Sequence, residues 1–337
     1  MDVVRLREIA SRYGRLRAVL VGDIALDRYL HIDPELAETS LETSLPVRNV
    51  TAVRPQPGGG GNVLANLAAL APGSLAAVGC CGDDGEGMEL RRALEEIGVD
   101  LAGLLIRPDR MTFTYTKPLL IHPDRPPEEL SRLDLRSRSE PPEDLQDQIV
   151  ARLRAAAADA DLIVAMDQVP ESGCGVLTRR VKAAIGELAR ESPEKVFLAD
   201  SRSAIEEFDG VRIKVNRAEL ARRFGAAEDA ADTEALARRW SEQIGRDVFV
   251  TLGERGIVVA SAGQATHVPG IRAEPPIDVV GAGDSVLASI AMALGAGASP
   301  VEAAEIGNLA GSVAVRKIGT TGTASITELE AAISAGD

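Results

Sequence analysis

The chain has 337 residues, of which 45% are hydrophobic and 3% aromatic, and it contains 32 glycines. This length is enough for a large α/β domain with a buried core, and the composition is typical of a globular protein. A formal net charge of −14 argues against a nucleic-acid partner, because nucleic-acid phosphates need a basic surface. The three cysteines lack metal-ligand spacing, which favours reduced thiols and a cytoplasmic location.

The N-terminal residues 1–17 carry charges throughout, which predicts a short amphipathic helix and not a signal peptide. No uninterrupted apolar run is long enough to span a bilayer, so we expect no membrane partner.

A short apolar strand is expected at Arg17–Gly22, and two carboxylates, Asp23 and Asp27, follow its end. Ligands of open α/β sheets bind at the carboxyl ends of the strands, which makes both residues candidates for substrate binding. The alternative is that they are loop carboxylates that face water.

Two segments without helical periodicity interrupt the α/β pattern. Leu45–Val53 alternates in part and ends before Pro55, and Met111–Ile121 is rich in strand-favouring Thr, Phe and Tyr. We expect the two to pair as a small sheet that covers one mouth of the main sheet, as a lid. The lid segments, about 28–56 and 107–136, are inserted in a single domain that spans residues 1–337.

Four glycines precede Asn62 and a predicted helix at Val63–Leu70. Because consecutive glycines cost backbone entropy, we expect a close approach to the chain at Gly58, Gly59 and Gly60. Asn62 can cap the helix and also offer its amide to a polyhydroxylated ligand. A flexible loop with an ordinary helix cap is the alternative.

From Ser74 onward apolar strands alternate with helices. The strands are expected at Leu75–Val78, Leu101–Ile106, Leu162–Met166, Val196–Ala199 and Val211–Val215, and the helices at Gly85–Ile97, Glu143–Ala156 and about Gly175–Ala189. This alternation predicts a mostly parallel, doubly wound sheet in a three-layer α/β/α sandwich.

Asn216 and Glu219 form an NxxE sequence just after one of these strands. The spacing places an amide and a carboxylate on one helical turn, where the carboxylate can order the water shell of Mg²⁺. An asparagine cap with a surface glutamate is an equal alternative.

Val248–Thr251 and Ile257–Ala260 then predict a hairpin with a glycine-rich turn between them.

The residues Ile277–Ala293 contain a short apolar strand, a Gly281-Ala282-Gly283 turn, and Asp284 at the start of a helix. Backbone N–H groups at such a turn attract an anion, which a carboxylate would repel. Asp284 is therefore better interpreted as a base that takes a proton from a hydroxyl while the neighbouring amides hold the developing charge. An N-capping aspartate is the alternative.

Asn308 lies in a predicted helix of small residues, Ala303–Val315, which is followed by a glycine-containing segment, residues 316–322. Beside Asp278, this segment can form a cation site from carbonyl oxygens, or it can simply end the helix.

A phosphate loop of the GxxxxGK[ST] type, a GxGxxG motif, a protein-kinase catalytic loop and HExxH are all absent from the sequence.

Five motifs in this order resemble the PfkB/ribokinase family of carbohydrate kinases over essentially the whole chain. They are VGDIALD (Val21–Asp27), PGGGGNVLAN (Pro57–Asn66), NRAE (Asn216–Glu219), VTLGERG (Val250–Gly256) and DVVGAGDS (Asp278–Ser285). The resemblance implies ATP-dependent phosphorylation of a sugar hydroxyl, with Mg²⁺ and in some members K⁺, on a ribokinase-like fold that often dimerises through its lid.

The resemblance also implies roles for individual residues. Asp284 would be the catalytic base, with Gly281, Ala282 and Gly283 in the anion hole. Asp27 and residues 58–62 would hold the sugar. Residues on the nucleotide and Mg²⁺ side would be Asn216, Glu219, Thr251, Gly253, Gly256 and Asn308, and monovalent-cation ligands would be Asp278 and the carbonyls of Val280, Ala314 and Gly319.

Within the family, the closest resemblance is to the kinase domain of the bifunctional ADP-heptose synthesis enzymes, which makes D-glycero-D-manno-heptose 7-phosphate the first substrate candidate. Cations expected near a substrate phosphate are Arg28, Arg48, Arg54, Lys117 and Arg132. The Asp-Pro-Lys of that branch is here Asp200-Ser201-Arg202, so Arg202 is a candidate replacement for a lysine at ATP. Other sugar or nucleoside kinases, an inactive kinase-fold module and a dinucleotide-dependent oxidoreductase are alternatives.

Overall fold

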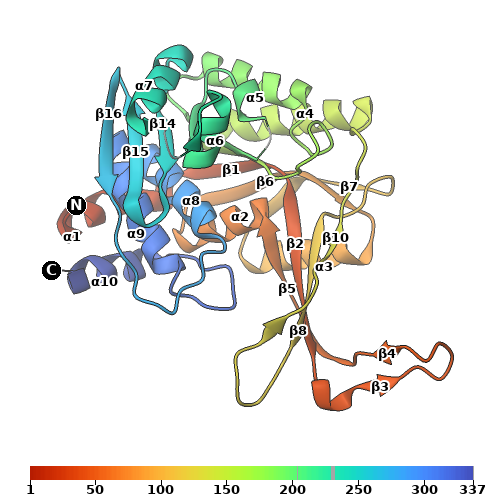
Figure 1. The fold of residues 1–337 in the computed structure, drawn as a ribbon. Helices are drawn as coiled ribbons and strands as arrows, with labels where there is room; N and C mark the ends of the chain where they lie inside the picture. The colour runs from red at the N-terminus through yellow and green to blue at the C-terminus, as the bar shows by residue number, and fades with distance from the viewer. Residues whose placement is uncertain (203, 229–231, 337) are drawn as a thin grey trace.

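A nine-stranded sheet runs through the computed structural model, which describes residues 1–202, 204–228 and 232–336 (Figure 1). Its parallel part consists, in spatial order, of β7 (Asp100–Arg107), β6 (Ser74–Gly82), β1 (Arg17–Gly22), β11 (Leu162–Asp167), β12 (Val196–Ser201), β13 (Arg212–Asn216) and β14 (Val248–Thr251). The antiparallel strands β15 (Gly256–Ser261) and β16 (Gln264–Pro269) complete one edge. The predicted mostly parallel sheet is confirmed.

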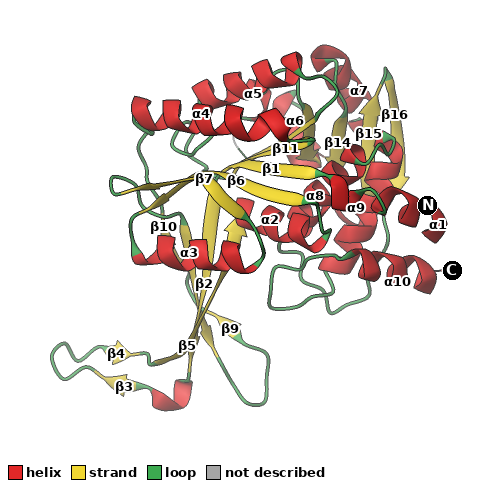
Figure 2. Ribbon diagram, turned by 180° about the vertical axis from the view of Figure 1, so that it is seen from behind, coloured by secondary structure: helices red, strands yellow, loops and turns green. Residues whose placement is uncertain are grey.

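Helices cover both faces of this sheet (Figures 1 and 2). One face packs against α4 (Glu143–Asp159), α5 (Arg179–Glu191), α6 (Arg217–Arg223) and α7 (Thr233–Ile244). The other face packs against α1 (Val3–Ala10), α2 (Gly60–Ala69), α3 (Gly85–Glu96), α8 (Ala282–Gly295), α9 (Pro300–Ala314) and α10 (Ile326–Gly336). Because helices cover both faces, central strands such as β11 and β12 are buried at every residue.

A second, five-stranded sheet projects from the carboxyl ends of the central strands (Figure 1). We call it the lid sheet. It consists of β10 (Leu133–Leu135), β8 (Thr114–Leu120), β2 (Ile24–Ile32) and β5 (Val50–Gly59) in this order, with β9 (Glu128–Glu129) paired to β8. A small hairpin of β3 (Glu38–Thr39) and β4 (Pro46–Val47) forms its tip. Both predicted lid segments contribute strands, but the expected pairing between them is wrong, because β2 lies between β5 and β8.

The sequence placed the first lid strand incorrectly. Leu45–Val53 is not one strand, since it contains β4 and the start of β5, and β5 continues through Pro55 and Pro57 to Gly59. This is possible because β5 is at the edge of the lid sheet, where proline need not donate a ladder hydrogen bond. The strand β2, which connects the main sheet to the lid sheet, was not predicted.

Two smaller expectations near the helix starts are also wrong. The segment before Gly281 is an exposed loop and not a strand, with Val279 68% exposed, because it lies outside both sheets. The helix expected from about Gly175 begins at Arg179, where the Thr178 side chain caps it.

In the described residues, no helix has both the length and the apolar character needed to cross a membrane.

Candidate active site

The helix α8 begins at the carboxyl ends of the central strands, and Gly281 is its N-cap. Gly281 has a φ of +80°, and a Cβ there would lie 2.8 Å from Cγ2 of Thr321, so only glycine fits this turn. Asp284 is therefore in the first turn of α8 and does not cap it. The amides of Ala282, Asp284 and Ser285 donate to carbonyls of the same turn at 3.1–3.3 Å.

Asp284 is half-buried, and burial raises the pKa of its carboxyl to about 7. The charges of Lys214 and Arg202 and a hydrogen bond from Asn62 oppose this rise, whereas the negative charge of Asp200 adds to it. A carboxyl with a pKa near neutrality is suited to accept a proton from a hydroxyl and release it again.

Asn62 reaches Asp284 because α2 packs beside α8. It lies in the first turn of α2 and is 8% exposed. The preceding glycines allow close packing: a Cβ on Gly58 would lie 2.6 Å from Oδ1 of Asp27, and one on Gly60 would lie 2.8 Å from the Asp23 carbonyl oxygen. Gly59, at the end of β5, is the N-cap of α2, so the expected cap by Asn62 is wrong. The expected close approach at these glycines is therefore present.

Asp27 forms a buried ion pair on the lid sheet. Lys117 Nζ on β8 donates to Asp27 Oδ2 on β2 at 2.9 Å and to the Tyr29 hydroxyl at 3.2 Å. Burial raises the pKa of Asp27, and the Lys117 charge opposes that rise. The pair is buried at the base of the lid sheet, next to Gly58.

Two arginines stack on tyrosines around this ion pair. The guanidinium of Arg54 lies 4.2 Å from the ring centre of Tyr29, and that of Arg132 lies 4.2 Å from the ring centre of Tyr115. Both arginine charges act on Asp27. Arg132 is also held by Asp134, whose carboxylate accepts from Nε at 2.6 Å.

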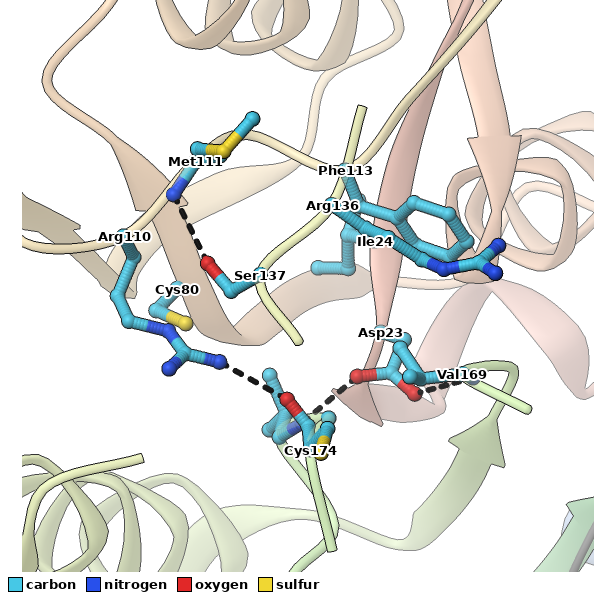
Figure 3. A pocket seen from close by; sticks show the side chains of 12 residues that line it. Asp23, Ile24, Cys80, Arg110, Met111, Phe113, Arg136, Ser137, Val169 and Cys174 are labelled. Atoms are coloured by element: carbon cyan, nitrogen blue, oxygen red, sulfur yellow. Dashed lines mark hydrogen bonds between the residues drawn. The ribbon is translucent and has the colours of Figure 1, made fainter. Parts of the chain in front are cut away.

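Asp23 has a different environment (Figure 3). Its buried carboxylate accepts hydrogen bonds from the backbone amides of Gln168, Val169 and Val176 at 2.7–3.1 Å. Together with Arg110, which donates to the Cys174 carbonyl at 2.8 Å, it holds the loop after β11. The structure therefore places Asp23 against the protein's own backbone, whereas Asn62 and Asp284 meet each other.

The NxxE residues form a capping box at the start of α6. Asn216 Oδ1 accepts from the Glu219 amide at 2.9 Å, and Glu219 Oε2 accepts from the Asn216 amide at 2.7 Å. Glu219 is half-buried, and burial raises its pKa. These contacts are those of a helix cap, the alternative that the sequence left open for Asn216 and Glu219. The cap also holds the Glu219 carboxylate near Asp200 and Lys214, whose charges act on its pKa.

The predicted hairpin residues surround the ends of β14 and β15. Thr251 Oγ1 donates to the Val215 carbonyl at 3.3 Å, and Gly253 and Gly256 have positive φ values of +63° and +97°. Asn308 on α9 donates to the carbonyls of Val268 and Pro269 at 3.1 and 3.0 Å. A cavity of about 620 Å³ adjoins this region, lined by residues that include Arg217, Leu252, Glu254 and Gly270.

The sequence pattern of the pfkB family carbohydrate kinases matches residues 19–327. The chain belongs to this family. It is 33% identical over 323 residues to the bifunctional protein HldE of Mesorhizobium japonicum, and 32% identical over 322 residues to that of Citrifermentans bemidjiense. The matches cover 94% of this chain but 62% and 63% of those relatives, so the chain spans less than two thirds of their length.

Solved structures of other carbohydrate kinases share the fold of this pfkB-family chain. The Arabidopsis thaliana ribokinase, solved with ribose and ATP, has a TM-score of 0.68 at 18% identity, and covers 95% of this chain and 99% of its own. A mutant of Escherichia coli phosphofructokinase-2 has a TM-score of 0.71 at 18% identity, with coverages of 95% and 99%. The chain is thus a phosphotransferase with an alcohol acceptor on a ribokinase-like fold.

Lys214 lies beside the start of α8 in this pfkB-family kinase, and the sequence analysis did not single it out. Its Nζ forms an ion pair with Oδ2 of Asp200, and its side chain is 7% exposed. The signal was a lysine between the apolar residues Ile213 and Val215 of one predicted strand, together with Asp200 just after the predicted strand Val196–Ala199. Arg202, the expected replacement for a lysine, is exposed, although its charge acts on Asp284 and Tyr115.

The predicted monovalent-cation loop is largely bonded to the protein itself. The Asp278 carboxylate accepts from the amides of Val280 at 3.0 Å and Gly319 at 3.3 Å. The Gly319 carbonyl accepts from Arg54 Nη2 at 3.1 Å, and the Ala314 carbonyl accepts from the Lys317 amide at 3.0 Å. A guanidinium therefore already supplies positive charge at one of the expected cation ligands.

Proposed function

We propose that this kinase transfers the γ-phosphoryl group of ATP to a hydroxyl of a sugar phosphate, with D-glycero-D-manno-heptose 7-phosphate as the first candidate. The observation that carries this proposal is the position of Asp284. Its carboxylate lies in the first turn of α8, has a pKa raised to about 7 by burial, and lies near the Asn62 side chain, which acts to lower that pKa.

In the proposed reaction, Asn62 and Asp27 bind the acceptor sugar, and Asp284 removes the proton from its reacting hydroxyl. The alkoxide oxygen forms a bond to the γ-phosphorus as the bond from that phosphorus to the β-phosphate oxygen breaks. ADP leaves with the electron pair of that bond, and the proton remains on Asp284 until solvent takes it. The Gly283 amide and the start of α8 stabilise charge on the phosphoryl oxygens.

The residues on the nucleotide side suit a divalent cation. The carboxylates of Asp200, Glu219 and Asp284 gather around Lys214, and the charges of Arg202 and Arg222 act on this cluster from outside it. Mg²⁺ keeps several waters and uses few protein carboxylates, which fits Glu219 as a ligand through water. When bound, Mg²⁺ neutralises negative charge on the phosphates. Thr251, Gly253, Gly256 and Asn308 would line the nucleotide.

An acceptor that already carries a phosphate is supported by the lid sheet. Lys117, Arg54 and Arg132 lie around the buried carboxylate of Asp27, and Asp134 pairs with Arg132, so these three cations outnumber the two carboxylates by one. Stacking on a tyrosine holds each guanidinium in a fixed orientation, and a phosphate bound here would share these donors with Asp134 and the Gly319 carbonyl. The resemblance to the kinase domain of the bifunctional ADP-heptose synthesis enzymes gives heptose 7-phosphate as the candidate, and the chain is also similar to bifunctional proteins named HldE.

We further propose that the kinase forms a homodimer through the lid sheet. The apolar side chains of Val53 and Leu133 are exposed by 44% and 59%, and β5 presents a free edge in this part of the structure. Sedimentation of the purified protein tests this. A monomer at micromolar concentration would contradict it.

A coupled assay of ADP release with Mg²⁺-ATP, run over sugars and sugar phosphates, tests the proposed reaction. We expect turnover with heptose 7-phosphate to exceed turnover with the unphosphorylated heptose. Turnover confined to unphosphorylated sugars or nucleosides would contradict the acceptor class, and no turnover with any acceptor would favour an inactive ligand-binding module.

A further inference from the structure

Lys182 on α5 is a buried lysine that the proposed reaction does not use. Its side chain is 2% exposed, and Nζ forms an ion pair with Oδ2 of Asp167 at 2.9 Å and donates to Oε2 of Glu207 at 3.1 Å. Lysine is rarely buried to this degree unless it is paired. The two carboxylates lie on different segments, because Asp167 ends β11 whereas Glu207 follows β12. Lys182 therefore links α5 to the carboxyl ends of two central strands.

Asp167 extends this link to the last residue of β12. Its Oδ2 also accepts from the Ser201 hydroxyl at 2.8 Å, and its carbonyl accepts from the Arg202 amide at 3.1 Å. The Ser201 hydroxyl oxygen in turn accepts from the Ala204 amide at 3.1 Å. Together with the contact of Glu207, these hydrogen bonds hold the chain on both sides of Arg202.

Arg202 lies where the two sides of the proposed site meet. Its side chain is exposed, but its charge acts both on Asp284 in the first turn of α8 and on Tyr115 of β8 in the lid sheet. Because an exposed arginine has many rotamers, a fixed backbone is needed to keep its charge near one point. The hydrogen bonds of Asp167 and Ser201 provide such a backbone.

The charges near Lys182 explain why a cation is needed in this place. The charge of Asp167 acts on Asp23, whose carboxylate is also buried and binds the loop after β11. Two neighbouring buried carboxylates repel each other, and a buried carboxylate that loses its ion-pair partner is strongly destabilising. Lys182 offsets this repulsion, so that Asp167 can keep its contact with Ser201.

We propose that Lys182 is a positioning residue of the kinase, which holds Arg202 between the base on α8 and the lid sheet. It acts through its two carboxylate partners, Asp167 and Glu207. This inference rests on the proposed role of Asp284. The charge of Arg202 then favours the deprotonated form of the base, whereas a lysine with only a structural role would have no influence on it.

The test compares the pH dependence of kcat/KM in Lys182→Met and Arg202→Gln with that of the wild type. ADP release is measured with Mg²⁺-ATP and the best acceptor from the screen. We expect both variants to move the rise of kcat/KM to higher pH by about 0.5 to 1 unit, because Asp284 loses a positive neighbour. The double variant Lys182→Met/Arg202→Gln should show no additional shift. The groups that act on the pKa of Asp284 from the surrounding elements are Lys214, Asp200, Asn62 and Arg202.

Lys195→Met is the matched control. The Nζ of Lys195 donates to the carbonyls of Ala157 and Ala158 near the end of α4 at 2.7 and 2.8 Å. Lys195 directly precedes β12, so it lies at the opposite end of this strand from Arg202. We expect the pH profile of Lys195→Met to equal that of the wild type.

Hydrogen–deuterium exchange gives a readout that does not depend on turnover. In Lys182→Met the amides of Arg202 and Ala204 should exchange about 10-fold faster than in the wild type, whereas Lys195→Met should leave them unchanged. Because Lys182→Met leaves Asp167 buried without its partner, the double variant Lys182→Met/Asp167→Asn repeats both measurements with that charge removed. We expect the same shift and the same faster exchange.

A wild-type pH profile or wild-type exchange at Arg202 in both Lys182→Met and Lys182→Met/Asp167→Asn would overturn the inference. A shift for Lys182→Met that keeps its full size in the Arg202→Gln background would also overturn it, because Lys182 would then act by another route. The proposed role of Asp284 fails separately, if Asp284→Asn keeps a near-normal kcat. In that case faster exchange of Arg202 and Ala204 in Lys182→Met would still support the positioning of this segment by Lys182.

Discussion

The two sides of the site balance charge in opposite ways. On the α8 side, Asp200, Glu219 and Asp284 gather around the buried Lys214, and the charge of the exposed Arg202 also acts on Asp284. On the lid side, Lys117, Arg54 and Arg132 lie around the buried Asp27, and Asp134 pairs with Arg132. The first side needs an added cation before it can hold a triphosphate, whereas the second can hold an anionic acceptor without one. The difference indicates which substrate needs the metal.

Removal of Mg²⁺ should therefore have the largest effect. With excess EDTA we expect ADP release to fall below detection, because the carboxylates of the α8 side would repel an uncompensated triphosphate. Coupled ADP assays before and after readdition of Mg²⁺ measure this. Full activity in EDTA would contradict this, because Lys214 and the backbone amides at the start of α8 would then bind the triphosphate without a metal ion.

Loss of the lid arginines should affect the acceptor and not the nucleotide. In Arg54→Gln and Arg132→Gln we expect KM for the sugar phosphate to rise by about 10- to 100-fold each, the value of a charge-assisted hydrogen bond. KM for ATP should change little. An equal rise in KM for an unphosphorylated sugar would contradict this, because the two arginines would then support the structure of the lid sheet and not bind a substrate phosphate.

The α8 side was more predictable from sequence than the lid side. Gly281, Asp284, Asn62 and Glu219 lie in motifs in which glycine and helix-start chemistry restrict the local structure, and the structure places Asn62 at Asp284. The lid sheet depends on pairing between β2, β5 and β8, which are far apart in the sequence. Prolines in β5 also disguised a strand, because its place at an edge cannot be read locally.

Lys214 and Asp23 show the same limit at single residues. Lys214 gains its place beside Gly283 only when β12, β13 and α8 are assembled. Asp23 was placed correctly at the end of β1, but its carboxylate binds the backbone of the loop after β11, a contact between segments 145 or more positions apart. The position of a residue along a strand was predictable, but its partner was not.

The pH dependence tests the charge balance of the α8 side. Asp284 must be deprotonated to act as a base, so with its pKa at about 7 the value of kcat/KM should rise with pH and level off above that value. The charged groups that act on it are Lys214, Asp200 and Arg202. In Asp200→Asn, one negative neighbour is lost, so the rise should move to lower pH. An unchanged profile in Asp200→Asn would contradict this account.

The smallest expected effect is that of K⁺. Because Arg54 donates to the Gly319 carbonyl, we expect replacement of K⁺ by a bulky monovalent cation to change wild-type turnover only slightly. In Arg54→Gln the same replacement should reduce turnover more. A strong K⁺ requirement in the wild type would show that the loop of Asp278 and Gly319 binds the ion despite Arg54.

The most direct test of the central claim is the turnover of Asp284→Asn with Mg²⁺-ATP and the best acceptor from the screen. The amide cannot take the hydroxyl proton, so we predict a fall in kcat of about 10²- to 10⁴-fold, with nucleotide affinity and the thermal unfolding midpoint unchanged. A near-normal kcat in a folded Asp284→Asn protein would contradict the account, because the acceptor hydroxyl would then lose its proton without this carboxylate.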